Sequence, residues 1–185
     1  KDTLPALDSV IATVRNQPGR EAEVSDAYWF RGLCLAEVAE FDRSRQDFER
    51  LLVLKRARYG DDHPDVGWAH MDFAETQIIA GNFQIAAPQL ERAMAIFTQR
   101  FGPDHADTQV GHYEQARILH WGGDAAAAVP LFERVVKHWR QSLGEDHLWT
   151  LYAQAELGWA LADAGRRDEA RVWLQRSREI AARRL

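Results

Sequence analysis

The chain has 185 residues, of which 46% are hydrophobic and 28% charged, and its formal net charge is −5. The composition is that of an ordinary folded protein, and the acidic balance argues against nucleic acid as a partner, because phosphate binding needs a concentrated basic surface. The single cysteine, Cys34, excludes an intramolecular disulfide, and no apolar run is long enough to predict a membrane span. The first residues, KDTLPALDSV, do not resemble a signal peptide. We therefore expect a cytoplasmic location, with a periplasmic domain of a larger protein as the alternative.

Apolar residues recur at helical spacing along almost the whole chain. The first predicted helix covers residues 4–15, and a loop at 16–19 follows it. Four predicted hairpins of two helices each come next, over 22–38 with 41–58, 64–80 with 83–101, 106–121 with 125–142, and 148–163 with 167–184. In the second hairpin Asp62 is a favourable N-cap, Pro64 suits a first helical turn, and Gly81 suits the end of a helix.

The hairpins are copies of one unit. The tetrapeptide GDDH at 60–63 returns as GPDH at 102–105 and as GEDH at 144–147, which is a period of 42 residues. Two further columns keep this period, with small residues at Gly32, Ala74, Ala116 and Gly158, and bulky apolar residues at Phe48, Leu90, Phe132 and Leu174. The small residues are expected to let the two helices of each pair approach closely, so that stacked copies bury a continuous core.

This period predicts one continuous solenoid. Its expected parts are a truncated preceding repeat at 1–19, followed by repeats at 20–59, 60–101, 102–143 and 144–185. The chain begins without Met and stops one residue before the next expected glycine, so we expect it to be a fragment of a larger protein.

The recurring pattern Gly-x-Asp-His-(Pro), a helix with a central small residue, and then Gly-x-(Phe)-x-x-Ala-x-x-Leu/Phe-Glu-Arg resembles the tetratricopeptide repeat. The 42-residue period with its Asp-His loop is similar to the kinesin-light-chain type of that repeat. This resemblance implies an all-α fold, a right-handed α–α superhelix of about four helix hairpins plus a partial N-terminal repeat helix. It also implies that the first helix of each hairpin lines a concave groove that binds an extended peptide or a partner's helix. An enzymatic activity or a cofactor is not expected.

The groove positions that the resemblance implies carry aromatic and acidic residues. The resulting candidate partner-binding residues are Trp29, Leu33, Trp68, Met71, Asp72, Glu75, Tyr113, Arg117, Tyr152, Glu156 and Trp159. Tryptophan and tyrosine dominate binding energies at interfaces, and the carboxylates would favour a partner with hydrophobic and basic character. The alternative is that several of the rings fill gaps between stacked helices.

The sequence departs from the family at these positions. The Asn-Asn pair common in the kinesin-light-chain type is replaced by Trp29-Phe30, Met71-Asp72, Tyr113-Glu114 and Ala155-Glu156. Arg117 is the only cation among the groove positions, so a clamp for a C-terminal carboxylate is not predicted.

Other motifs favour structure over chemistry. His63 and His70 are seven residues apart, roughly 10 Å along a helix, which is too far to share one metal ion. We therefore expect the repeated histidines to cap or lock the loops, and we predict no metal site. No phosphate-binding glycine loop, nucleophile elbow or HExxH motif occurs. Cys34 is predicted to be a small core residue.

The leading hypothesis is a protein–protein interaction module without nucleic-acid or membrane binding by this segment. One alternative is a domain that senses a ligand or peptide within a larger bacterial transcriptional regulator or Ser/Thr kinase. Another is self-association into a homo-oligomer through the repeat ends or the groove.

Overall fold

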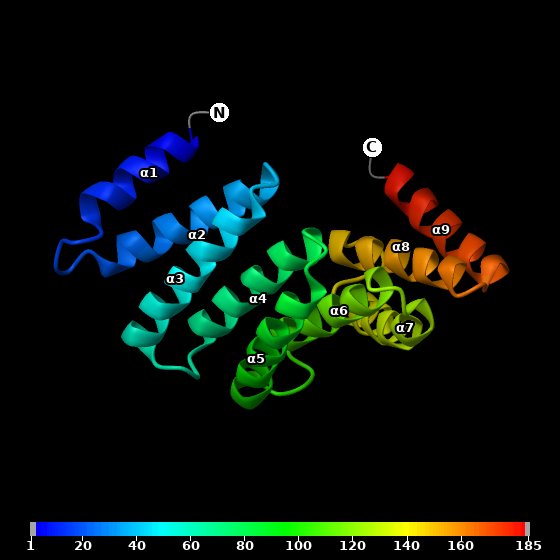
Figure 1. Cartoon of the computed structure of the whole chain (residues 1–185). Helices are drawn as coiled ribbons and strands as arrows, with labels where there is room; N and C mark the ends of the chain where they lie inside the picture. Colours follow the sequence, from blue (N-terminus) through cyan, green and yellow to red (C-terminus); the bar gives the residue numbers. More distant parts are fainter. Residues whose placement is uncertain (1–2, 184–185) are drawn as a thin grey trace. The chain divides into compact units, whose positions relative to one another are not determined.

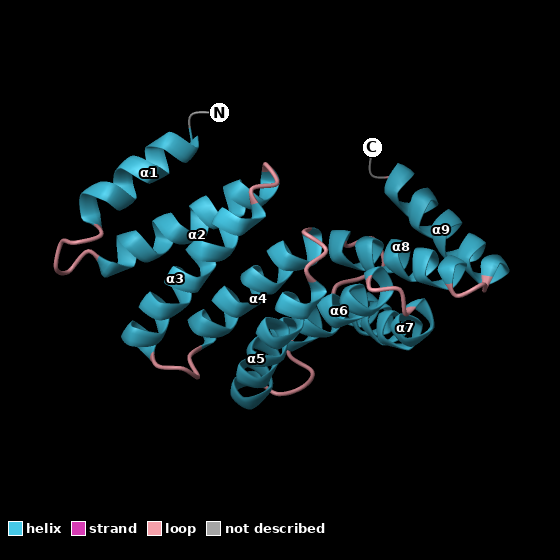
Figure 2. Ribbon diagram, in the orientation of Figure 1, coloured by secondary structure: helices cyan, strands magenta, loops and turns pink. Residues whose placement is uncertain are grey.

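A computed structural model of the protein describes residues 3–183, and every regular element in that range is an α-helix. Figures 1 and 2 show these helices joined by short loops. Their bounds are α1 Thr3–Val14, α2 Glu21–Glu37, α3 Phe41–Tyr59, α4 Pro64–Ile79, α5 Phe83–Phe101, α6 Ala106–Trp121, α7 Ala125–Ser142, α8 Leu148–Asp163 and α9 Arg167–Ala182. The predicted helices are confirmed to within two residues at each end, except that the predicted last residue, 184, lies outside the described range. The repeat boundaries stay a prediction.

The chain separates into two compact units, residues 1–105 and 106–185. In the first unit each of α1 to α4 packs against the next helix, and α2 also contacts α4. In the second unit α6 to α9 pack in the same sequential way, and α6 also contacts α8. We call α2, α4, α6 and α8 the A helices and α3, α5, α7 and α9 the B helices. Within each unit the A helices are therefore direct neighbours.

The small and bulky columns of the repeat face each other across each hairpin. A Cβ added to Gly32 on α2 would lie 2.9 Å from the Phe48 ring on α3, and one added to Gly158 on α8 would lie 2.6 Å from Leu174 on α9. Ala74 and Ala116, which hold the same column in the other two hairpins, are fully buried. The predicted close approach is confirmed, and it explains why this column tolerates only Gly or Ala.

Aromatic rings fill the space that this approach leaves. In the first unit the Phe48 and Phe73 rings stack with their centroids 5.6 Å apart, and both are buried. In the second unit Tyr113 packs against Phe132 and Trp139, with centroid distances of 6.0 Å and 5.3 Å. Buried aromatic side chains of this size contribute several kcal/mol each to core stability. Both units thus have their own aromatic core.

The loop histidines act as N-caps, which corrects the assignment of Asp62. His63 is the N-cap of α4, and its Nδ1 accepts a hydrogen bond of 3.1 Å from the backbone N–H of Asp65. The Asp62 carboxylate instead accepts a hydrogen bond of 2.8 Å from Arg92 on α5. His147 repeats the arrangement on α8. The expectation that repeated histidines lock the loops is confirmed at these two positions.

The turn between the two helices of a hairpin needs a residue with positive φ. Gly81, Gly123 and Gly165 hold this position, and the first hairpin has Ala39 there with φ of 61°. A left-handed conformation costs an L-residue about 1–2 kcal/mol, although glycine also loses more entropy on folding, by roughly 0.5–1 kcal/mol.

We therefore expect Ala39→Gly to raise the free energy of unfolding by roughly 0.5–1 kcal/mol, measured by urea unfolding. Gly81→Ala is the reciprocal control, since no atom lies within 4 Å of the added Cβ and only the backbone effect remains. It should lower the free energy of unfolding by a similar amount. If both variants are as stable as the original chain, the backbone explanation of this column is wrong.

Candidate partner-binding faces of the A helices

The A helices of the first unit present an apolar face with acidic residues. Exposed and half-buried positions follow helical spacing on α2 and on α4. The residues in these two rows are Asp26, Phe30, Leu33 and Glu37, and Trp68, Asp72, Glu75 and Ile79, of which Leu33 and Asp72 are half-buried. Phe30 is 52% exposed and Trp68 is 37% exposed, which is unusual for rings of this size. We call these eight residues the unit 1 A face.

Trp29 and Asp72 join the two helices of this face. The Trp29 indole N–H donates a hydrogen bond of 2.6 Å to the Asp72 carboxylate, and the Trp29 ring packs edge-on against Phe30. Burial raises the pKa of Asp72 to about 6; the bond from Trp29 opposes this change, and the nearby Glu75 adds to it. The predicted contact residues Trp29 and Asp72 are thus brought together, but their polar atoms already satisfy each other.

The other predicted residues of this unit lie in three different environments. Met71 is 2% exposed and belongs to the interior, so a partner cannot touch it in this structure. Leu33 is half-buried on α2, and Glu75 is exposed on α4. Trp68 is exposed at its edge, while its ring packs on the buried Phe97 with centroids 5.2 Å apart. Trp68, Glu75 and part of Leu33 are therefore the predicted residues that a partner could contact.

On α6 the predicted residues are buried. Tyr113 belongs to the aromatic core described above. Arg117 donates hydrogen bonds of 3.0 Å and 2.8 Å to the two carboxylate oxygens of Glu114, and both side chains are buried. The Arg117 guanidinium also lies 4.4 Å from the centroid of the Trp121 ring, a cation–π distance. Tyr113 therefore fits the alternative prediction, that some rings fill gaps between stacked helices. Trp121, which was not among the predicted contact residues, is an exposed ring on α6.

On α8 two predicted rings are well exposed. Tyr152 is 52% exposed and Trp159 is 51% exposed. Glu156 lies between these two rings on the same face of the helix. Glu156 itself is buried, and its Oε2 lies 3.6 Å from Nδ1 of His120 on α6. His120 donates through Nε2 to Asp163 Oδ2 at 2.8 Å, because a carboxylate only accepts. We call Tyr152, Glu156, Trp159 and Asp163 the unit 2 α8 face.

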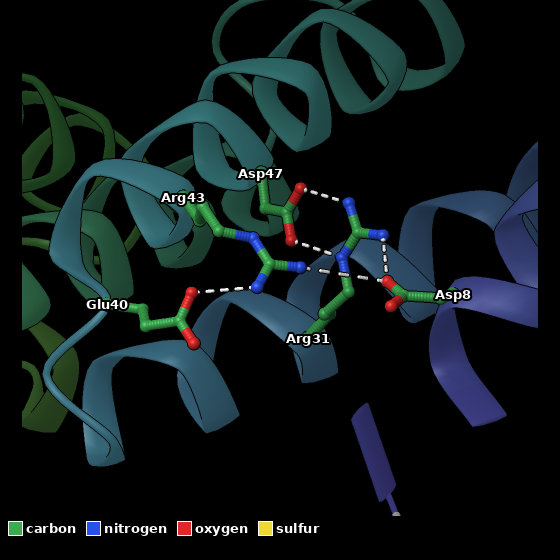
Figure 3. A network of polar contacts seen from close by, with 5 residues as sticks. All are labelled: Asp8, Arg31, Glu40, Arg43 and Asp47. Atoms are coloured by element: carbon green, nitrogen blue, oxygen red, sulfur yellow. Dashed lines mark hydrogen bonds and ion pairs between the residues drawn. The ribbon is translucent and has the colours of Figure 1, made fainter. Parts of the chain in front are cut away.

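Two polar clusters away from these faces were not predicted. Figure 3 shows Arg31 between Asp47 and Asp8, with Arg43 joining Asp8 to Glu40. The Arg31 guanidinium binds both Asp47 oxygens, at 2.7 Å and 2.6 Å, and links α2 to α3, while its 2.6 Å contact with Asp8 extends the network to α1. The sequence contained a signal for this ion pair. The residues that correspond to Arg31 and Asp47 in the last repeat are the apolar Leu157 and Trp173, so the two charges of the first repeat occur together at positions that can be apolar.

The second cluster surrounds His70, which is buried on α4. Its Nδ1 lies 2.7 Å from the amide oxygen of Gln89, and its Nε2 lies 2.9 Å from the Arg56 guanidinium. Since arginine only donates, Nε2 accepts and Nδ1 carries the proton, so the imidazole is neutral. Burial is the main reason that the pKa of His70 falls to about 4, and Arg56 adds to the decrease. This side chain joins α3, α4 and α5 through both of its ring nitrogens.

Across residues 3–183, no group of three or more His, Cys, Asp or Glu side chains is placed to hold a metal ion. No helix in that range is long and apolar enough to cross a membrane. Cys34 is half-buried, so it is not the core residue that the sequence suggested.

A family model described as tetratricopeptide repeat matches residues 23–99 and 104–183. The chain belongs to the tetratricopeptide repeat family, whose α-helical solenoids are protein-interaction scaffolds. Its 42-residue period is similar to that of the kinesin-light-chain type of this repeat. No curated protein matches the chain significantly.

Solved structures support the same fold. One similar protein is a putative kinesin light chain from Podosopora anserina, solved as a set of TPR-like repeats that are nearly identical to one another. Its sequence is 23% identical to this chain. The Q17M form has a TM-score of 0.78 and the match covers 97% of this chain and 85% of that chain. A second structure of these repeats has a TM-score of 0.76, with 97% and 86% covered. BtubC (BKLC) from P. vanneervenii is 16% identical with a TM-score of 0.77, and the match covers 95% of this chain and 70% of that chain.

Proposed function

We propose that the chain binds a peptide or helix of a partner protein on the A-helix faces, and that this partner segment is hydrophobic and basic. The observation that carries the proposal is the exposure of large rings on the A helices. Phe30 and Trp68 in the first unit, and Tyr152 and Trp159 in the second, are all exposed to solvent, and exposed apolar surface of this kind is typical of interaction sites. Rings of this kind supply most of the binding energy when a partner removes them from water.

Charge supports the basic character of the partner. The unit 1 A face carries Asp26, Glu37, Asp72 and Glu75 and no cation. From Leu148 to Asp163, α8 has two carboxylates and no Lys, Arg or His. The B helix α3 is different, since residues 41–59 hold six basic and three acidic side chains. A basic segment would therefore be attracted to the A helices more strongly than to the surface of α3.

The proposal is tested by selecting binders from a displayed library of random peptides and measuring the affinity of the selected peptides. We expect Trp68→Ala or Trp159→Ala to weaken the binding of at least one selected class by about tenfold or more, which corresponds to about 1.4 kcal/mol. Val172→Ala is the matched control, because Val172 is an exposed apolar residue on the B helix α9. It should leave every affinity unchanged.

Circular dichroism of each variant verifies folding before affinities are compared. If the library yields no binder, or if binding is insensitive to both tryptophans, the proposed function is wrong. The self-association alternative then gains weight if the mass in solution rises with concentration.

A further inference from the structure

One acidic position of the repeat accepts hydrogen bonds from side chains inside the protein in two copies, whereas in the third copy one carboxylate oxygen has no hydrogen-bond partner. Asp72, Glu114 and Glu156 stand 42 residues apart in the same column. Asp72 accepts the Trp29 indole N–H, and Glu114 accepts two bonds from Arg117. Among residues 3–183, Glu156 Oε2 has no hydrogen-bond partner, although its side chain is only 9% exposed.

The side chain nearest to Glu156 does not supply the missing donor while it is neutral. His120 uses the proton on Nε2 to bind Asp163, so Nδ1 of the neutral imidazole carries a lone pair. This Nδ1 is also without a hydrogen bond in the described part of the chain, and it lies 3.6 Å from Oε2. With the imidazole in this neutral form, two acceptors face each other in a buried position. A buried carboxylate oxygen without a donor is unfavourable, so a cation from outside would supply a hydrogen bond that this oxygen lacks.

The residues around Glu156 suit the side chain of a lysine or an arginine. Tyr152 lies one turn before Glu156 on α8, and Trp159 lies about one turn after it, so the two exposed rings are separated by roughly 10 Å along the helix. Tyrosine and tryptophan rings attract a cation that lies within about 6 Å of the ring centroid. Asp163 follows Trp159 by one turn on the same face, and its side chain is 67% exposed. The two rings, the two carboxylates and the lack of Lys, Arg or His on α8 therefore all favour a positively charged ligand group.

We propose that the unit 2 α8 face binds one lysine or arginine side chain of the partner peptide. The apolar stem of that side chain lies on Tyr152 and Trp159, and its charge is attracted by the nearby carboxylate of Glu156, whose side chain is 9% exposed. This inference rests on the proposed function and deepens it, because it assigns the selection of basic partners to Glu156. Asp72 holds the same column in the first unit, but it is already paired with Trp29.

The test is a double-mutant cycle between the chain and a peptide taken from the displayed library. Every Lys in a selected peptide is replaced in turn by norleucine, which keeps the stem and removes the charge. At one position we expect the replacement to weaken binding to the original chain by about tenfold, and binding to Glu156→Gln by less than about twofold. Peptides that carry Arg at that position are tested with the same norleucine replacement.

Two controls make the cycle decisive. Asp72→Asn removes the charge at the same column in the first unit, and it should leave the effect of norleucine at about tenfold. The norleucine peptide should bind the original chain and Glu156→Gln equally well, which shows that the variant is folded and that its rings are intact.

The possible failures are distinguishable. If selected peptides depend on Tyr152 and Trp159 but show no coupling with Glu156, the inference is overturned while the proposed function stands, and the His120 imidazole occupies the place that we assign to the cation. If selected peptides contain no Lys or Arg, the inference is likewise overturned. If no peptide binds at all, the proposed function itself fails.

Discussion

Replacing Arg31 by Leu should lower the free energy of unfolding by about 3–5 kcal/mol, the largest effect that we expect from a single substitution in this chain. The Asp47 side chain is 4% exposed and receives both of the hydrogen bonds described above from the Arg31 guanidinium. Without Arg31 the carboxylate would remain buried with no compensating charge. Urea unfolding followed by circular dichroism measures the change.

Two comparisons separate the charge effect from lost packing. The double variant Arg31→Leu/Asp47→Leu removes both charges, and it should recover most of the lost stability, since well-packed apolar residues often replace a buried ion pair without loss. Asp8→Asn removes only the half-exposed partner of Arg31, and it should change the free energy of unfolding by less than about 1 kcal/mol. A double variant as unstable as Arg31→Leu alone would show that packing by Arg31, and not its charge, holds α2 against α3.

The sequence predicted the helices well because the repeat supplies several copies of each local signal. Glycine marks the turn within three of the four hairpins. In the first hairpin Ala39 holds this position and adopts a positive φ, as the glycines do. Likewise the contact between Gly32 and Phe48 was predictable, because four copies of this small–bulky pairing stand in register. Agreement among copies turns weak propensities into a strong prediction of the fold.

The candidate site was less predictable because helix rotation decides which ring is exposed. Met71 and Asp72 are adjacent in sequence, yet Met71 faces the interior and Asp72 faces the A face. Tyr113 was assigned to the binding surface by register, but the large Trp139 ring on α7 packs against it and buries it. Such differences depend on the size of a side chain from another helix, which a single column of the repeat does not show.

Polar partners were also hard to predict from spacing. Trp29 and Asp72 are 43 residues apart, one more than the period, so their hydrogen bond joins different columns of neighbouring repeats. The same offset joins His120 to Asp163 in the second unit. A search for polar pairs at the period plus one would have found both, and it indicates that neighbouring A helices are joined in this way in each unit.

Replacing Asp72 by Asn should stabilise the chain above pH 7 and have little effect below pH 4. The ordinary pKa of this carboxyl is 3.8, and in the folded chain it is about 6. Protonation therefore stabilises the folded state; this contribution is complete below about pH 4 and is lost as the pH rises through 6. Asparagine stays neutral and still accepts the Trp29 N–H. At pH 8 we expect Asp72→Asn to raise the free energy of unfolding by roughly 1–3 kcal/mol, measured by urea unfolding.

His70 provides a comparison of opposite sign. Its pKa falls from an ordinary 6.5 to about 4 in the folded chain, so its contribution to stability is present above pH 6.5 and is lost as the pH falls towards 4. We expect His70→Gln, which copies Gln154 at the same column, to lose less stability on acidification than the original chain. In the original chain the effects of Asp72 and His70 on the free energy of unfolding partly cancel between pH 4 and 6, because protonation of Asp72 favours the folded state and protonation of His70 opposes it.

One outcome would contradict the prediction for Asp72→Asn. A pH-independent difference between Asp72→Asn and the original chain would show that Asp72 is ionised in the folded state throughout this range, and that its bond with Trp29 outweighs the effect of burial.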